Sequence, residues 1–342
     1  MMNIRLWLLV LFLVGIAALP ATPSRAQHAD VSRAEHADVS RAEHADVSRA
    51  EHAEAPVQVA MGALPGGSPL MLVGTVFRDC SDCPEMVVMP LGDFSMGVAP
   101  GEEEAEEVPA RFRGRAEPRH KVAVNQAFAV SRYEVTVGEF SRFIQATGRK
   151  MDGCWLSSNR QWKLLEERNW RLPGYGQTDH DPVVCVSWDD ARAYVDWLSG
   201  ALKQRYRLLS ESEWEYVTRT GTATPRPWGK AIGRNYANCQ GCGSRWDGQR
   251  PAPVGSFSVN RFGLFDMLGN VAEWVEDCWH DNYKDAPAEG VAWTTGSCEF
   301  HVIRGGSWVD QPRNVRAAQR DRDTPGMRSV FLGFRIARNI TP

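Results

Sequence analysis

The sequence predicts a single loop-rich domain, with a few short helices and strands, behind a long leader. Nearly all of the 13 tryptophans and 13 phenylalanines lie after Val76, so the hydrophobic core has to form there. Beyond Gly221 the residues Gly, Trp, Asn and Pro recur every few positions, and only short strand-like pieces interrupt them. Ordering so much irregular backbone costs conformational entropy, so we expect disulfides and bound ions to offset that cost.

Residues 1–26 have the pattern of a secretory signal peptide. Arg5 supplies the positive start, an apolar stretch follows over residues 6–19, and Ser24-Arg25-Ala26 is a small-residue cleavage site. The alternative is an uncleaved membrane anchor, but the apolar stretch is short for a bilayer and two prolines follow it at once. We therefore expect a periplasmic or secreted protein that has no membrane span after signal cleavage.

Residues 27–76 are expected to form a disordered, low-complexity linker. The octet HADVSRAE begins at His28, His36 and His44 and starts a fourth time at His52. A period of eight is not that of solenoid repeats, and the octet lacks large apolar side chains. The histidines could recruit a metal, but their even spacing on an unstructured chain offers no preorganised geometry. Residues 57–74 are rich in Gly and Pro and extend the linker.

Eight cysteines, all after the linker, indicate disulfides in an exported chain. The favoured pairs are Cys80–Cys83, Cys239–Cys242, Cys154–Cys185 and Cys278–Cys298. The alternative is a zinc site made by the two C-x-x-C elements. An oxidising compartment favours the disulfides.

Short strands are predicted at several places by local pattern. Residues 87–96 predict two strands around a Pro-Leu-Gly-Asp turn, and residues 122–130 predict one strand. Between them, an acidic run at 102–107 and three arginines at 111–115 indicate a solvated loop. Further short strands are expected at 302–303 and 334–336.

Three helices are predicted by their N-terminal capping residues. Thr136 and Glu139 form a capping box for a helix that runs to Ala146. Ser187 precedes a second helix with acids in its first turn and an apolar face. Ser210, with Glu213 three positions later, starts the third.

Several functional classes are excluded by composition or motif. A formal net charge of −3 provides no basic stripe for nucleic acid. The sequence also lacks a phosphate-binding P-loop, an H-E-x-x-H zinc helix and a G-x-S-x-G nucleophile elbow.

Seven segments, taken in order, resemble the signature of the sulfatase-modifying-factor, or formylglycine-generating-enzyme, family. The resemblance covers residues 80–338 and implies an α+β domain over residues 77–340 with a C-type-lectin-like fold and little regular secondary structure. The segments are MVVMPLGDFSMG (86–97), RYEVTVGEF (132–140), PVVCVSWDDARAYVDWL (182–198), YRLLSESEWEYVTRTGT (206–222), NRFGLFDMLGNVAEWVED (260–277), VIRGGSW (302–308) and GFRIAR (333–338).

The resemblance implies a copper site whose ligands this chain lacks. Copper enzymes of the family hold Cu(I) with two cysteines placed shortly after a Gly-Gly-Ser motif, and soft thiolates suit that ion. Here no cysteine follows Ser307, and Asp310 stands near the place of the first missing one. A lone carboxylate is a hard ligand. We therefore expect neither copper nor formylglycine formation by the copper route.

A ligand cleft is nevertheless expected around the same motif. Ser307 matches the motif serine, and Arg320 matches an arginine in the family's substrate cleft. Trp308 and Asp310 are placed beside them by proximity in sequence. Two alternatives stay open: Arg320 could pair with an acid at the surface, and Trp308 could be a core residue rather than a stacking platform.

The resemblance also implies two structural calcium sites built from hard oxygen ligands. The first would use carboxylates and carbonyls of Asp266, Gly269, Val271 and Glu273. The second would use side chains and carbonyls of Asn238, Cys239, Asp247 and Gln249. For the first segment the alternative is a turn in which Asp266 and Asn270 satisfy local backbone groups.

Three functions are compatible with the sequence. The first is an accessory module that binds a peptide, a small polar ligand or a co-exported protein. The second is a periplasmic enzyme with altered oxidative chemistry, similar to family members implicated in pyoverdine maturation. The third is a true formylglycine-generating oxidase that acts on sulfatases, which the missing cysteines oppose.

Overall fold

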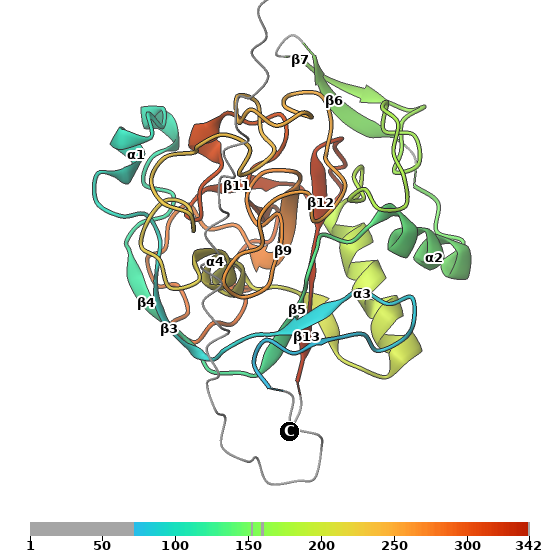
Figure 1. The fold of residues 1–342 in the computed structure, drawn as a ribbon, viewed down its shortest axis with the longest axis horizontal. Helices are drawn as coiled ribbons and strands as arrows, with labels where there is room; N and C mark the ends of the chain where they lie inside the picture. Colours follow the sequence, from blue (N-terminus) through green and yellow to red (C-terminus); the bar gives the residue numbers. More distant parts are fainter. Residues whose placement is uncertain (1–71, 152, 159–160, 341–342) are drawn as a thin grey trace, which may run out of the picture. The chain divides into compact units, whose positions relative to one another are not determined.

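The computed structural model describes residues 72–151, 153–158 and 161–340, which belong to one compact unit (Figure 1). The predicted signal peptide and residues 27–71 of the predicted linker lie outside the described residues. The strands are β1 (Val76–Phe77), β2 (Met86–Val88), β3 (Gly92–Met96), β4 (His120–Val124), β5 (Phe128–Ser131), β6 (Cys154–Ser158), β7 (Gln161–Leu165), β8 (Tyr206–Leu208), β9 (Ala272–Cys278), β10 (His301–Arg304), β11 (Arg320–Asp323), β12 (Leu332–Phe334) and β13 (Ile336–Asn339). The helices are α1 (Glu102–Ala105), α2 (Val137–Thr147), α3 (Trp188–Leu202) and α4 (Glu211–Arg219), with short 3-10 turns at Ala110–Phe112 and Pro312–Asn314.

The three predicted helices are confirmed, and each begins at the predicted capping residue. Thr136, Ser187 and Ser210 each accept a hydrogen bond from the backbone three residues later, and the acid at that position returns one. These reciprocal bonds satisfy backbone donors that the first helical turn leaves unpaired. Helix α2 ends at Gly148, which has a φ of 66°.

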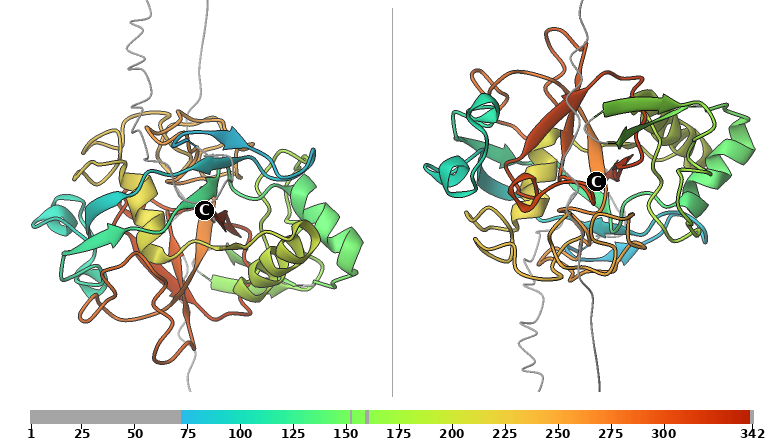
Figure 2. Two further views of the ribbon diagram at one scale, coloured as in Figure 1. Left: turned by 90° about the horizontal axis from the view of Figure 1, so that it is seen from below. Right: turned by 90° about the horizontal axis from the view of Figure 1, so that it is seen from above.

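Two sheets organise the domain. The larger has the strand order β1-β2-β5-β13-β8, and the smaller has the order β11-β10-β9-β12, in which β12 runs parallel to β9. The pairs β3-β4 and β6-β7 form separate two-stranded sheets. Helices α2 and α3 lie together on one side of β5 and β13, and α4 lies on the other side (Figures 1 and 2). Little of the described chain is regular, as the sequence predicted, and the fold is a mixed helix and strand arrangement.

The buried residues form two main clusters, one for each group of helices. In the first cluster, Phe140 and Phe143 of α2 and Tyr194 of α3 pack against one another and against the strand residue Phe334. Trp214 and Val217 on the inner face of α4 belong to the second cluster, which also contains residues of β3, β4, β9 and β10. Helix α4 is therefore the link between the smaller sheet and the β3-β4 pair.

The structure corrects three local predictions. The acidic run at 102–107 is not a solvated loop, because Glu102 lies in α1 and forms a buried ion pair with Arg316 at 2.8 Å. The predicted strand at 122–130 is two strands in different sheets, β4 and β5. The segment 334–336 likewise breaks at Arg335, where the chain passes from β12 to β13.

Among the described residues, no helix combines the length and the apolar character that crossing a bilayer requires.

Candidate functional site

The Ser307 loop begins with two glycines in left-handed conformations. Gly305 has a φ of 95° and Gly306 a φ of 68°. A Cβ atom on Gly306 would lie 2.7 Å from the carbonyl oxygen of Asn314. Strand β10 can therefore turn into the loop at this point only because residue 306 has no side chain. The turn buries Ser307 completely.

Gly306→Ala is expected to lower the free energy of unfolding more than Gly148→Ala. The left-handed backbone at either position costs an alanine about 1–2 kcal/mol. Only Gly306 adds a collision with backbone, because a Cβ on Gly148 meets no atom within 4 Å. Urea unfolding with the disulfides intact measures both losses. Equal losses would show that the Ser307 loop relaxes freely around the added methyl group.

Asp310, at the expected place of a copper-binding cysteine, closes the loop on itself. One of its carboxylate oxygens accepts hydrogen bonds from the Ser307 amide at 2.9 Å and from the Ser307 hydroxyl at 2.7 Å. The other accepts from the Asn314 side-chain amide at 3.0 Å. Both oxygens therefore serve the fold of the loop.

Trp308 packs in the core, which is the alternative that the sequence left open. Its side chain is 7% exposed, and its indole N–H donates to the Val330 carbonyl at 3.2 Å. The Tyr175 ring meets it edge to face at 6.0 Å, and the Tyr175 hydroxyl donates to the same carbonyl. Trp308 thus fixes the segment before β12.

Arg320 is enclosed by protein rather than open to a ligand. Its guanidinium donates to both oxygens of Glu211, at 2.6 and 2.9 Å, and to the carbonyls of Arg115 and His280. It also lies over the ring of Tyr283 at 4.2 Å. Burial alone would lower the pKa of Arg320, but the charge and hydrogen bond of Glu211, together with Tyr283 and Asp277, raise the net pKa.

The four residues predicted to line a ligand cleft differ in their exposure. Ser307, Trp308 and Arg320 are all buried, and only Asp310 is partly exposed. The buried polar groups have hydrogen-bond partners inside the fold: Ser307 donates to Asp310, and Arg320 donates to Glu211. Neither a surface ion pair nor an open cleft describes Arg320.

Glu211 is a central residue that sequence reasoning missed. It lies at the start of α4 and also accepts from the Tyr283 hydroxyl at 2.9 Å and pairs with Arg304 at 3.2 Å. Arg304 in turn reaches Glu215 at 2.6 Å. Burial alone would raise the pKa of Glu215. The charges of Arg219 and Arg304 act in the opposite direction, and the net pKa is lowered. The signal was present, because acids at 211 and 215 are four residues apart on one face of a helix.

The first predicted calcium set retains one free side-chain oxygen. Both Glu273 oxygens accept from Arg335 at 2.8 Å, and one also accepts from the Trp214 indole at 2.7 Å. Asp266 accepts from the Gly255 amide with one oxygen, while its other oxygen is buried without a partner. Burial raises the pKa of Asp266 to about 6. An unpaired buried carboxylate oxygen fits a cation ligand.

The backbone around this set has the tight turn that the sequence indicated. Gly269 has a φ of 78°, and a Cβ there would lie 2.6 Å from the Asn238 carbonyl oxygen. Val271 follows at the start of β9 and is buried. The Asn270 side chain bonds the backbone of Ala252, 18 residues earlier in the chain, rather than a local backbone group. Glu134, which accepts from Asn270, has a second buried oxygen without a partner.

In the second predicted calcium set, the side-chain oxygens of Asn238 and Asp247 have hydrogen-bond partners within the protein. The two Asp247 oxygens accept from the amides of Gly241 and Gly243, at 2.6 and 2.7 Å. The Asn238 side-chain oxygen accepts from Ser244 at 2.8 Å. The Cys239 carbonyl accepts from Cys242, and the Gln249 amide donates to Trp246. In the described part of the chain, no group of three or more His, Cys, Asp or Glu side chains is placed to hold a metal.

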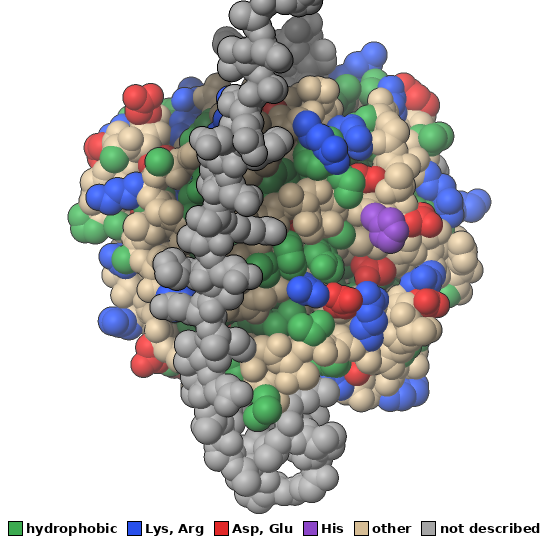
Figure 3. Space-filling model, viewed as in Figure 1, with side chains coloured by type: hydrophobic (Ala, Val, Ile, Leu, Met, Phe, Trp, Pro, Cys, Tyr) green, Lys and Arg blue, Asp and Glu red, His purple; other side chains and the backbone are tan. Residues whose placement is uncertain are grey.

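A pocket of about 160 Å³ opens in the loops between α4 and β9. The rings of Trp228 and Tyr236 stack there at 5.6 Å, and Phe257 and Val259 also line the pocket. Figure 3 shows apolar side chains gathered near the centre of the face on which these loops lie. The sequence indicated loops here but no pocket.

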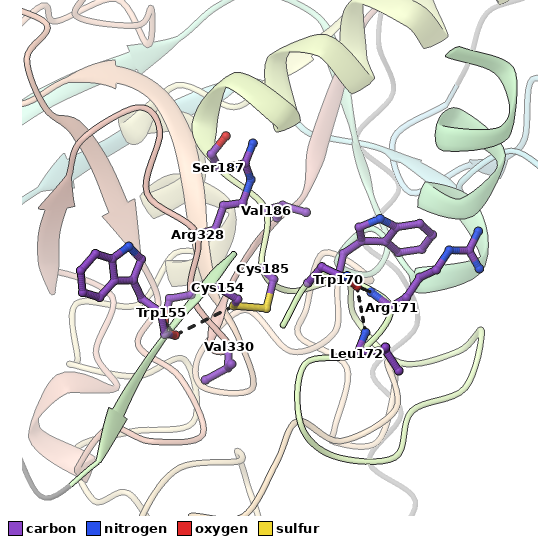
Figure 4. The surroundings of a disulfide bond; sticks show 12 residues. Cys154, Trp155, Trp170, Arg171, Leu172, Cys185, Val186, Ser187, Arg328 and Val330 are labelled. Atoms are coloured by element: carbon purple, nitrogen blue, oxygen red, sulfur yellow. Dashed lines mark hydrogen bonds between the residues drawn. A yellow bond between two sulfur atoms is a disulfide. The ribbon is translucent and has the colours of Figure 1, made fainter. Parts of the chain in front are cut away.

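The structure joins the cysteines in the four predicted pairs. Cys80–Cys83, Cys154–Cys185, Cys239–Cys242 and Cys278–Cys298 account for all eight cysteines of the chain. Figure 4 shows Cys154–Cys185, which ties β6 to the segment before α3 close to Ser187 and Arg328. No thiol remains in the oxidised protein.

Comparison with known proteins gives a consistent match. Residues 73–340 match the family described as "Sulfatase-modifying factor enzyme 1-like domain". The chain is 31% identical to the formylglycine-generating enzyme of Bos taurus, covering 83% of this chain and 79% of the bovine enzyme. It is also 31% identical to the serine/threonine-protein kinase pkn1 of Chlamydia pneumoniae, but spans only 38% of that protein's length.

Two solved structures resemble the fold. PvdO from Pseudomonas aeruginosa is 40% identical, with a TM-score of 0.69 over 78% of this chain and 99% of that chain. Treponema denticola variable protein 1 is 21% identical, with a TM-score of 0.59 over 78% of this chain and 99% of that chain, and shows the fold alone.

Proposed function

The chain belongs to the sulfatase-modifying factor enzyme 1-like family, and from that premise we propose that it is an exported ligand-binding member that does not use thiolate-bound copper. The observation that carries the proposal is the Asp310 carboxylate, which accepts three hydrogen bonds within its own loop where a thiolate would be needed. Four disulfides, which consume every cysteine, support the same conclusion and favour an oxidising compartment.

The pocket beside Trp228 and Tyr236 is the proposed ligand site. Stacked aromatic rings provide apolar area and a face for a planar or cationic group at low entropic cost. The pocket volume suits a single side chain or ring of a peptide or small polar ligand. Partner recognition would then rest on loops held by α4 and β9, a rigid scaffold.

An assay with a cysteine-bearing sulfatase peptide and added copper tests the loss of copper chemistry. We expect no formylglycine product by mass spectrometry, while a copper-dependent enzyme of the family converts the same peptide in parallel. Formylglycine product from the purified chain would overturn the proposal.

Binding of the same labelled peptide, followed by fluorescence anisotropy, tests the pocket. Trp228→Ala is expected to weaken binding about tenfold or more, since a buried aromatic anchor contributes on that scale. Leu172→Ala, which removes an exposed apolar side chain outside the pocket, serves as the control. Equal affinities for both variants and the parent chain would exclude the pocket as the peptide site.

A second candidate function is oxidative maturation of a peptide without thiolate ligands. The observation that favours it is the 40% identity to PvdO, against 31% to the bovine formylglycine-generating enzyme. Oxygen uptake on addition of a peptide siderophore precursor would support this function. Saturable binding of the precursor without oxygen uptake would support the binding module.

Calcium is proposed as a structural cofactor at Asp266, whose free oxygen fits it. Chelation is expected to lower the melting temperature by several degrees, because a bound ion stabilises only the folded state. Asp266→Asn should abolish this response, whereas Asp247→Asn should keep it, since both Asp247 oxygens already accept backbone amides. A melting temperature that chelation does not change would remove calcium from the fold.

A further inference from the structure

The chain contains two C-x-x-C disulfides that have the same spacing and differ in burial. Cys80–Cys83 and Cys239–Cys242 both span a Cα–Cα distance of 5.1 Å. Cys239 and Cys242 are 0% and 1% exposed, so neither sulfur can be reached by an attacking thiolate. Cys80 is exposed and Cys83 is 4% exposed. Only the first pair presents one accessible and one protected sulfur, the arrangement that exchange chemistry needs.

The backbone at Cys80–Cys83 is held by contacts that do not depend on the sulfur–sulfur bond. The Arg78 guanidinium donates to the Cys83 carbonyl at 2.5 Å and to Glu85 at 2.9 Å. Arg142 donates to the Asp82 carbonyl from α2. None of these hydrogen bonds requires the sulfur–sulfur bond, so we expect the turn to persist when the bond opens.

The two longer bridges differ from Cys80–Cys83 in a second respect. Cys278–Cys298 also has an exposed cysteine, Cys298, but its partners are 20 residues apart. Cys154–Cys185 spans 31 residues, and both cysteines are fully buried. A bridge that closes a longer loop constrains the unfolded chain more, so the folded protein resists its reduction more strongly. Among the four disulfides, only Cys80–Cys83 combines an exposed cysteine with a short loop between the two bonded residues.

We propose that Cys80–Cys83 is a redox-active disulfide that exchanges with thiols through Cys80. A thiolate of a partner dithiol attacks the Cys80 sulfur, a mixed disulfide forms, and the Cys83 sulfur leaves as a thiolate that takes up a proton. The second thiol of the partner, in its thiolate form, then attacks the partner sulfur of the mixed disulfide. The Cys80 thiolate leaves and is protonated. Two electrons and two protons pass from the partner dithiol, which becomes a disulfide. The chain thereby acts as a dithiol oxidant.

Titration of the folded full chain with glutathione redox buffers, followed by alkylation and mass spectrometry, tests this inference. Cys80–Cys83 is expected to open at a reductant ratio at least about tenfold lower than any other pair. Cys83→Ser should accumulate a glutathione mixed disulfide at Cys80, while Cys242→Ser should leave Cys239 unmodified in the folded protein. Opening of Cys278–Cys298 first, or of all four pairs together with unfolding, would overturn the proposal.

Discussion

Arg320→Met is expected to lower the free energy of unfolding by about 3 kcal/mol, because it strips a buried carboxylate of its main partner. Glu211 would keep only Arg304 and the Tyr283 hydroxyl, and the carbonyls of Arg115 and His280 would lose their donor. Methionine keeps an unbranched apolar side chain of similar length, so the loss reports the charge, the hydrogen bonds and the guanidinium contact with the Trp279 ring rather than volume.

Arg322→Met on the same strand provides a matched control. Arg322 pairs with Asp281 at 3.4 Å, with side chains that are 38% and 84% exposed. Such a pair contributes about 0–1 kcal/mol. Urea unfolding with intact disulfides compares the two variants. Similar losses at 320 and 322 would mean that the buried network contributes no more than a surface pair.

Asp190→Asn is expected to lower the free energy of unfolding by about 2 kcal/mol, since it combines the loss of a helix cap with the loss of two partly exposed ion pairs to a buried carboxylate. Asp190 accepts from Arg149 at 2.8 Å, from Arg328 at 2.7 Å and from the Ser187 amide at 3.0 Å. The carboxylate thus joins α3 to the loop before β12. The neighbouring Asp189 is exposed in the same helical turn, so Asp189→Asn should change stability little.

The Asp190 effect should depend on pH. Burial alone would raise the pKa of Asp190, but hydrogen bonds from Arg328 and Ser187 outweigh it and lower it. A carboxyl with a lowered folded pKa stabilises fully above its unfolded pKa of about 4 and loses that contribution as pH falls through the folded value. The parent chain and Asp189→Asn should therefore lose more stability than Asp190→Asn between pH 5 and 2. Parallel acid profiles for all three proteins would contradict this assignment.

Local signals in the sequence identified the helices and the two C-x-x-C disulfides. Capping boxes at Thr136, Ser187 and Ser210 act within one turn, so sequence spacing alone reveals them. The two C-x-x-C pairs are equally local. The family motifs then indicated the fold, because they recur in order along the whole domain.

Long-range polar contacts could not be predicted in the same way. Arg320 and Glu211 are 109 residues apart, and Glu102 and Arg316 are 214 apart. Charge runs usually mark solvated segments, but the acidic run has a buried partner, Arg316, in a loop far away in the sequence. The sequence places Asp310 in the Ser307 loop. Its hydrogen bonds to Ser307 and Asn314 depend on the turn at Gly306, which the sequence alone does not reveal.

The chain completes both main sheets with residues 332–339. Strand β12 joins the smaller sheet, and after the buried Arg335 strand β13 inserts between β5 and β8 in the larger one. Both strands follow every other strand of the described chain, so neither main sheet is complete until residues 332–339 have joined it. Both main sheets therefore depend on pairings between residues far apart in the sequence, which form late in folding. A premature stop codon at Leu332 would spare every cysteine and every residue of the Ser307 loop, yet leave a chain without a native state.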